Sequence, residues 1–127
     1  MAARGPWSIL IVDDEPMIAS ALADLVAAEP SFTTRIVEDV ETAIAIGCES
    51  RPDAVLLDVR MPDGGGVRVA RALRDCAPDV KVVALSAETG AAIRREMIDA
   101  GALIFLDKSS DMPDLMVVLR RILEDES

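Results

Sequence analysis

The chain has 127 residues, a formal net charge of −10 and 51% apolar residues, which suits one domain with a sizeable buried core. The charge argues against nonspecific nucleic-acid binding, because that binding requires basic groups that neutralise phosphates. Histidine is absent, which excludes histidine acid–base catalysis, histidine metal ligands and phosphohistidine.

Membrane and secretory signals are missing from the sequence. No apolar run approaches the roughly 18 residues of a spanning helix, and residues 1–7 carry one Arg without an apolar segment and cleavage site behind it. The two cysteines, Cys48 and Cys76, match no metal spacing and are too few for a disulfide framework. We therefore expect reduced, partly buried thiols in a cytoplasmic protein that makes no contact with membranes.

Short apolar runs alternate with amphipathic stretches along the chain. The first run, Ser8–Val12, is typical of a strand covered on both faces, and Pro16 suits the first turn of the helix that follows. The other predicted strands are Thr33–Val37, Ala54–Leu57, Val80–Leu85 and Leu103–Leu106. The other predicted helices are Val40–Glu49, Val67–Cys76, Thr89–Ala100 and Asp111–Glu124.

Five buried strands alternating with five helices predict an α/β domain. Such a pattern favours a five-stranded parallel sheet with right-handed crossovers and helices on both faces. In strand order two-one-three-four-five, function collects at the carboxyl ends of the strands near the topological switch point. We assign residues 1–127 to this domain, with residues 1–7 as an N-terminal extension and residues 125–127 as a tail or the start of a linker.

Polar residues follow four of the predicted strands. Asp13 and Asp14 follow the first strand, Asp58 the third, Ser86 the fourth and Lys108 the fifth. Two carboxylates about 4 Å apart repel by roughly 4 kcal/mol at an effective dielectric of 20, and a divalent ion such as Mg²⁺ relieves that repulsion. Lysine and serine suit phosphoryl oxygens, and a carboxylate can act as the nucleophile in phosphoryl transfer.

With these residues, the sequence resembles the receiver domain of response regulators in two-component signalling. The resemblance covers essentially the whole chain. The resemblance implies the flavodoxin-like receiver fold and rests on residues in family order and spacing: Asp13, Asp14, Asp58, Met61, Pro62, Gly66, Ser86, Ala87, Phe105 and Lys108. The stretch Ala102–Ile104 lacks the acidic residues of winged-helix regulators and is closer to receivers of LuxR-type regulators.

The resemblance implies a phosphoacceptor and a Mg²⁺ site. Asp58 would accept the phosphoryl group. Asp14 and Asp58 would bind Mg²⁺ directly, Asp13 would act largely through water, and the backbone carbonyl of Arg60 would complete the protein ligands.

The resemblance also implies a switch. Ser86 and Lys108 would hold the phosphoryl group, and Phe105 would move with Ser86 to change the surface around the fourth and fifth helices. Arg60 and Glu88 each lie two residues beyond a site residue. We hypothesise that their side chains face each other across the site, beside the path of a hydrolytic water, and slow loss of the phosphoryl group.

The expected function is therefore a phosphoacceptor signalling switch rather than an enzyme acting on other substrates. A histidine kinase, a phosphotransfer protein or a small phosphodonor would supply the phosphoryl group. The alternative is a pseudo-receiver that is not phosphorylated and acts as a protein-interaction module. A haloacid-dehalogenase-like phosphatase is disfavoured, because it needs a second Asp where this chain has Arg60.

The chain departs from the family pattern after two site residues. Gly64 and Gly65 replace larger residues, and we expect the added backbone freedom to make the segment Pro62–Val67 mobile. Ser109 follows Lys108 where the family often has a cis proline. A cis bond without proline costs about 2.5–4 kcal/mol, so we expect a trans bond and a less securely placed Lys108.

The last predicted helix carries an apolar arc of roughly 160°, wider than the ≳100° of a typical core stripe. Its members are Met112, Leu115, Met116, Val118, Leu119, Ile122 and Leu123. Such an arc indicates either deep packing or a partner surface. We favour the second interpretation, a surface of this helix for a partner protein or for a homodimer.

Overall fold

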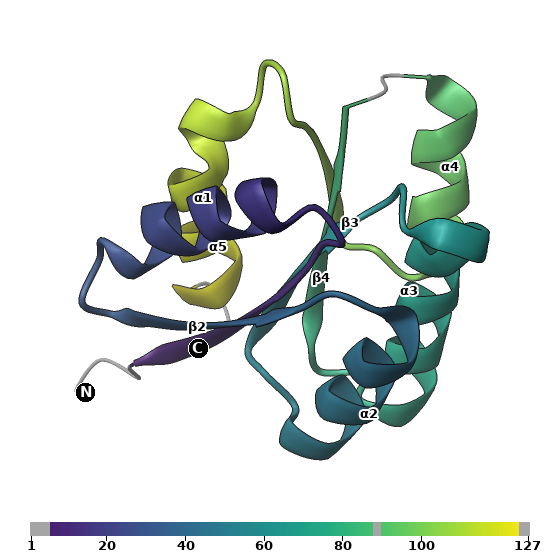
Figure 1. Cartoon of the computed structure of the whole chain (residues 1–127), viewed down its shortest axis with the longest axis horizontal. Helices are drawn as coiled ribbons and strands as arrows, with labels where there is room; N and C mark the ends of the chain where they lie inside the picture. The colour runs from purple at the N-terminus through teal and green to yellow at the C-terminus, as the bar shows by residue number, and fades with distance from the viewer. Residues whose placement is uncertain (1–5, 88–89, 125–127) are drawn as a thin grey trace.

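A computed structural model describes residues 6–87 and 90–124 of the chain. Within these residues strands and helices alternate, and two short 3-10 turns precede the third and fifth helices (Figure 1). The strands are β1 (Trp7–Val12), β2 (Phe32–Val37), β3 (Ala54–Asp58), β4 (Lys81–Ser86) and β5 (Ile104–Asp107). The helices are α1 (Pro16–Ala27), α2 (Val40–Ser50), α3 (Gly65–Cys76), α4 (Ala91–Ala100) and α5 (Leu115–Glu124), and the turns are Pro62–Gly64 and Met112–Asp114.

The five strands form one parallel sheet in the order β2-β1-β3-β4-β5. The predicted order and direction are confirmed. Helices α1 and α5 cover one face of the sheet, and α2, α3 and α4 cover the other (Figure 1). The order of the chain reverses between β1 and β3, which places a topological switch point at their carboxyl ends.

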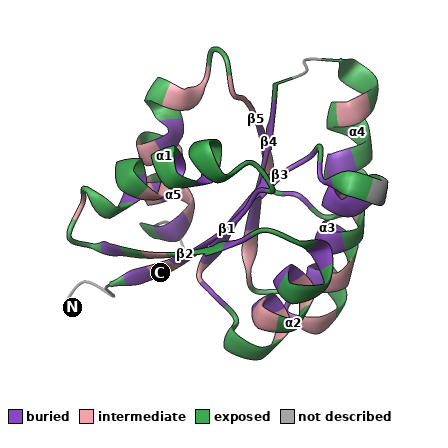
Figure 2. Cartoon of the chain, in the orientation of Figure 1, coloured by how far each residue is buried: buried purple, intermediate pink, exposed green. Residues whose placement is uncertain are grey.

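Each strand divides its side chains between two cores, because successive residues of a strand point to opposite faces. In β1, Ile9 and Ile11 pack under α1 and α5, whereas Leu10 and Val12 pack under α2 and α3. The central strands are therefore buried along their length (Figure 2). A sheet covered on both faces explains the nearly continuous apolar runs of the sequence.

The glycines after Asp58 have a steric role that the sequence did not reveal. Gly65 and Gly66 are buried in the first turn of α3, and a Cβ atom on Gly66 would lie 2.7 Å from the carbonyl oxygen of Val59. A Cβ atom on Gly65 would collide with Val40. These two glycines therefore let α3 begin against the backbone and against α2, and they do not merely loosen a loop. The mobility of the segment stays a prediction.

The expectation of two reduced thiols is wrong. Cys48 of α2 and Cys76 of α3 form a disulfide with their Cα atoms 5.5 Å apart. The two residues are separated by 28 positions, and the crossover through β3 brings their helices side by side. Spacing along the chain gives no sign of this proximity, because it arises from helix packing.

Most of the apolar arc on α5 is accounted for by packing within the domain. Leu115, Leu119 and Leu123 are buried, and half-buried Met112, Met116, Val118 and Ile122 pack against the same core. Val117 is 51% exposed. The deep-packing interpretation therefore explains the width of the arc, and a homodimer stays a proposal.

Substitution of Gly66 by Ala should lower the free energy of unfolding by about 2–3 kcal/mol, because the new Cβ must displace backbone rather than a flexible side chain. Urea denaturation with an unchanged m-value measures this loss. Gly90→Ala is the matched control, since a Cβ there meets nothing within 4 Å; its cost should stay within about 1 kcal/mol. Equal costs for the two variants would contradict the steric role of Gly66.

Candidate functional site

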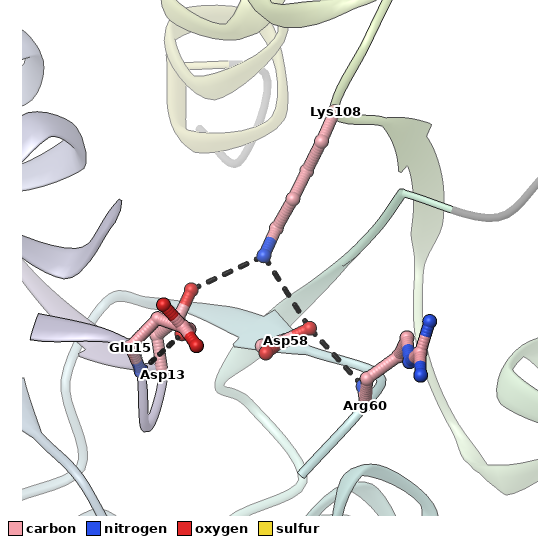
Figure 3. Close-up of polar contacts among 5 residues, drawn as sticks. All are labelled: Asp13, Glu15, Asp58, Arg60 and Lys108. Atoms are coloured by element: carbon pink, nitrogen blue, oxygen red, sulfur yellow. Dashed lines mark hydrogen bonds and ion pairs between the residues drawn. The ribbon is translucent and has the colours of Figure 1, made fainter. Parts of the chain in front are cut away.

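The candidate site lies at the carboxyl edge of the sheet, where several strands end together. Asp58 is the last residue of β3, Asp13 directly follows β1, and Lys108 directly follows β5. Neighbouring parallel strands present their carboxyl ends on one edge, so residues 95 positions apart in the sequence meet there. Figure 3 shows the Lys108 side chain reaching down between the two aspartates.

Three carboxylates converge at this edge. Asp13, Asp14 and Asp58 each offer an oxygen atom, and these oxygens lie within 4.8 Å of one another. Asp13 and Asp58 are 1% and 6% exposed, whereas Asp14 is exposed. Burial raises the pKa of Asp58 above its usual value, and the negative charge of Asp13 raises it further. The site therefore concentrates negative charge where solvent screens it poorly.

Lys108 offsets part of that charge. Its Nζ atom lies 3.2 Å from Oδ2 of Asp13 and 3.4 Å from Oδ1 of Asp58. The backbone amide of Lys108 donates to the carbonyl of Ser86 at 2.8 Å, which ties the end of β5 to the end of β4. The ammonium group thus opposes the rise in the pKa of Asp58.

Both buried aspartates accept a hydrogen bond from the backbone two residues further on. The amide of Glu15 donates to Asp13 at 2.9 Å, and the amide of Arg60 donates to Asp58 at 3.1 Å (Figure 3). Short acidic side chains commonly form such turns when the chain leaves a strand. The same bonds orient the carboxylates and, at Asp58, oppose the rise in pKa.

A hydrogen-bonded turn supports Lys108 in place of the proline that the sequence lacks. Asp107 accepts from the amide and hydroxyl of Ser109 at 2.7 and 2.6 Å. The amide of Asp107 donates to Asp111 at 2.8 Å. Side-chain hydrogen bonds thus hold the turn, and the expectation that Lys108 is less securely placed stays a prediction. The spacing of Asp107, Ser109 and Asp111 was the available signal, since Asp and Ser favour such turns.

Ser86 and Phe105 occupy the same face of the sheet, beneath α4. Phe105 pairs in register with Ala84 and packs in the same core, and Ser86, two residues beyond Ala84, points to the same side. Ser86 is fully buried and Phe105 is 6% exposed. The guanidinium carbon of Arg94 lies 5.2 Å from the Phe105 ring centroid, a cation–π contact that the sequence did not suggest.

A cavity of about 330 Å³ opens above Asp58. It is lined by Asp14, Glu15, Ile18, Asp58, Arg60, Ala87 and Lys108. The cavity brings together the acidic residues after β1, the end of β3 and the residue after β5, as the sequence predicted. It has room for a small tetrahedral group beside the Asp58 carboxylate.

Of the two residues proposed to affect phosphoryl lifetime, Arg60 lies within the described residues. Glu88 lies outside the described residues. Arg60 is exposed, its amide contacts Asp58, and its side chain extends away from Asp13 and Lys108 in Figure 3. The predicted pairing of these two side chains stays a prediction.

Comparison with known proteins identifies the family. A family profile described as "Response regulator receiver domain" matches residues 9–120. The chain belongs to this family. The acidic triad at the edge of the sheet is typical of the metal site of a receiver domain, and receiver domains are phosphorylated signalling modules that pair with histidine kinases.

Relatives and solved structures agree with this assignment. The chain is 31% identical to the response regulator MprA of Mycobacterium sp. strain KMS over 122 residues, which is 96% of this chain and 53% of MprA. It therefore spans about half the length of this relative. A LuxR-family response regulator from Aurantimonas sp. SI85-9A1 has a TM-score of 0.86 at 26% identity, covering 93% of this chain and 85% of that one.

The response regulator domain of Thermotoga maritima CheB has a TM-score of 0.83 at 25% identity, covering 93% of this chain and 96% of that one. The likeness to LuxR-type receivers expected from residues 102–104 is thus represented among the solved structures. Among the described residues, no helix combines the length and apolarity required to cross a bilayer.

Replacing Asp58 with Asn should raise the melting temperature by a few degrees at pH 7 in EDTA. Burial raises the pKa of Asp58 in the folded protein. Ionisation of Asp58 therefore lowers the stability of the folded protein as the pH rises from the unfolded pKa through the folded pKa. The advantage of the variant should shrink as the pH falls below the usual carboxyl range. Thermal melts between pH 3.5 and 7.5 measure it.

Asp107→Asn is the matched control with the opposite sign. Hydrogen bonds from Ser109 lower the pKa of Asp107, so this carboxylate contributes stability above its unfolded pKa that is lost as the pH falls. The variant should melt below the native protein at pH 7 and converge with it at low pH. A lower melting temperature for Asp58→Asn at pH 7 would contradict the burial argument.

Proposed function

We propose that this receiver domain is a phosphoacceptor switch in which Asp58 receives a phosphoryl group from a histidine kinase, a phosphotransfer protein or a small phosphodonor. The observation that carries the proposal is the position of Asp58. Its carboxylate is nearly buried at the end of β3, faces the ammonium group of Lys108 at 3.4 Å and opens onto a cavity of about 330 Å³.

The donor set of the site fits Mg²⁺. Three carboxylates within 4.8 Å supply oxygen atoms of the kind that a hard divalent cation prefers. Their combined negative charge exceeds the single positive charge of Lys108. We assign direct coordination to Asp14, Asp58 and the carbonyl of Arg60, with Asp13 acting through water. When bound, the cation supplies charge neutralisation for phosphoryl oxygens.

The chain's own residues position the reaction. A carboxylate oxygen of Asp58 attacks the phosphorus atom, an oxygen–phosphorus bond forms, and the bond from phosphorus to the donor breaks with its electron pair leaving on the donor. Lys108 already lies beside this oxygen and can turn from Asp13 and Asp58 to a phosphoryl oxygen. Transfer of this kind depends mainly on positioning and charge, which the rigid ends of β1, β3 and β5 supply.

Phosphorylation would be read out through Ser86 and Phe105. The new group adds about −1.5 to −2 charges at pH 7, and the Ser86 hydroxyl can donate to it. Phe105 shares the face of the sheet with Ser86 and contacts Arg94 of α4, so displacement of Ser86 would alter the packing beneath α4. The surface around α4 and α5 is the expected output.

The setting of this switch is also part of the proposal. The residues 1–127 form a receiver domain that acts in the cytoplasm, catalyses only its own phosphorylation and dephosphorylation, and contacts neither nucleic acid nor membrane. A homodimer through α5 would use Val117, which is 51% exposed on that helix. The chain spans about half the length of the relative MprA. The output of a longer protein that contains this domain has to be determined by experiment.

Incubation with acetyl phosphate and Mg²⁺ should add the mass of one phosphoryl group, measured by intact-protein mass spectrometry. Asp58→Asn should abolish the gain, and Lys108→Ala should slow it by about 100-fold, because a positioned charge stabilises the transferring group. Asp79→Asn is the control and should react normally, because Asp79 is an exposed carboxylate before the start of β4, at the opposite edge of the sheet. A gain that persists in Asp58→Asn would contradict the assignment, and no gain in the native protein would favour the pseudo-receiver alternative.

Substitution of Arg60 by Ala should shorten the half-life of the phosphorylated form several-fold, because Arg60 lines the cavity over Asp58 and its side chain restricts the access of water. The half-life is measured as decay of the added mass after removal of the phosphodonor. Arg68→Ala is a suitable control, since Arg68 pairs with Glu41 at 2.7 Å on the outside of α3 and α2. An unchanged half-life for Arg60→Ala would remove Arg60 from the proposal.

A further inference from the structure

A disulfide joins the C-terminal parts of two neighbouring helices. Cys48 lies in the last turn of α2, Cys76 is the last residue of α3, and their Cα atoms are 5.5 Å apart, within the roughly 4.4–6.8 Å usual for disulfides. Both residues are half-buried against the core under α2 and α3. The bond is therefore supported by the core on one side and reachable from solvent on the other.

Contacts that do not depend on the bond hold these helices together. Gly47 directly precedes Cys48, and a Cβ atom there would lie 2.5 Å from the side chain of Leu73, so the absence of a side chain lets α2 approach α3. Gly65 admits Val40 at the other end of the pair. The ion pair between Glu41 and Arg68 spans the same helices. Two thiols at these positions would therefore stay close enough to react with each other.

The segment closed by the disulfide includes Asp58, but the disulfide itself lies far from this residue. Residues 48–76 include β3 with Asp58 and the whole of α3. Helices α2 and α3 both run back from the carboxyl edge of the sheet, so the two sulfur atoms lie toward the opposite edge from Lys108. The disulfide belongs to no part of the site described above.

We propose that Cys48 and Cys76 form a reversible redox modification site whose substrates are low-molecular-weight thiols and disulfides of the glutathione class. On oxidation, the two S–H bonds of the protein are replaced by one S–S bond. A small disulfide accepts the two electrons and two protons and leaves as two small thiols. The reverse exchange restores both protein thiols.

The oxidised form clamps the end of α2 to the end of α3. A cross-link stabilises a protein by restricting the separation of the segments that it joins, and local opening begins in the least restrained elements. Residues 47–51 form the C-terminal turn of α2, which ends on Arg51 in the left-handed conformation, and the terminal turns of helices fray first. Reduction therefore releases this end of α2 while the fold persists.

Equilibration of the full chain in glutathione buffers of graded ratio, followed by alkylation and intact mass measurement, tests the proposal. The native protein should pass from disulfide to dithiol in a single two-electron transition without denaturant. On reduction, hydrogen exchange at residues 47–51 should rise about tenfold, while β3 and β4 stay protected. The double variant Cys48→Ser/Cys76→Ser should exchange like the reduced protein in every buffer.

Glycine variants separate a built site from a chance encounter of two thiols. Gly47→Ala pushes α2 from Leu73 and should lower the equilibrium constant for disulfide formation about fivefold, because the bond needs the close approach. Gly90→Ala, in open space, should change it less than about twofold.

Three results would overturn the proposal. The first is no disulfide in the most oxidising buffer, and the second is reduction that requires unfolding. The third is hydrogen-exchange protection of residues 47–51 in the double serine variant that equals that of the oxidised native protein. The last measurement decides the matter even when Gly47→Ala does not fold, because serine closely matches cysteine in size.

Discussion

The ammonium group of Lys108, 3.2 Å from Asp13 and 3.4 Å from Asp58, is the interaction on which the functional edge of this domain depends. Two nearly buried carboxylates beside an exposed third would repel one another strongly in a poorly screened position. Lys108 offsets part of this repulsion, while burial, together with the charge of Asp13, still raises the pKa of Asp58. The edge is thus arranged to accept additional positive charge, or a group that brings its own cation.

That interaction requires the parallel sheet behind it. Lys108 follows β5, Asp58 ends β3 and Asp13 follows β1, so the three groups meet only because parallel pairing brings these strand ends to one edge. Burial of both sheet faces keeps the ends rigid, and backbone amides two residues beyond each aspartate orient the carboxylates. The same sheet register places Ser86 and Phe105 on one face, which connects the edge to the packing beneath α4.

The helices on the α2–α3 face show how close packing shapes the rest of the molecule. Gly47, Gly65 and Gly66 each stand where a Cβ atom would collide with a neighbour. The close approach of α2 to α3 that Gly47 and Gly65 permit brings Cys48 within bonding distance of Cys76. A glycine triplet after a functional aspartate is easily interpreted as flexibility. Here two of its members are buried in a helix that begins against the backbone of Val59.

The sequence by itself determined the alternation of strands and helices, the parallel sheet, its order and the residues at its carboxyl edge. These features follow from local rules, since apolar runs mark buried strands and strand ends of a parallel sheet share one edge. The central strands and most helix boundaries agree with those rules to within a few residues.

Only the tertiary structure decided the Cys48–Cys76 bond and the Arg94 contact with Phe105. It also showed that the arc on α5 is largely packed within the domain. The disulfide joins α2 to α3, and the Arg94 contact joins α4 to β5. The distance between two such elements depends on side-chain packing, which hydrophobic periodicity does not encode. The periodicity of α5 defines its apolar face, but the three-dimensional packing decides how much of that face another element covers.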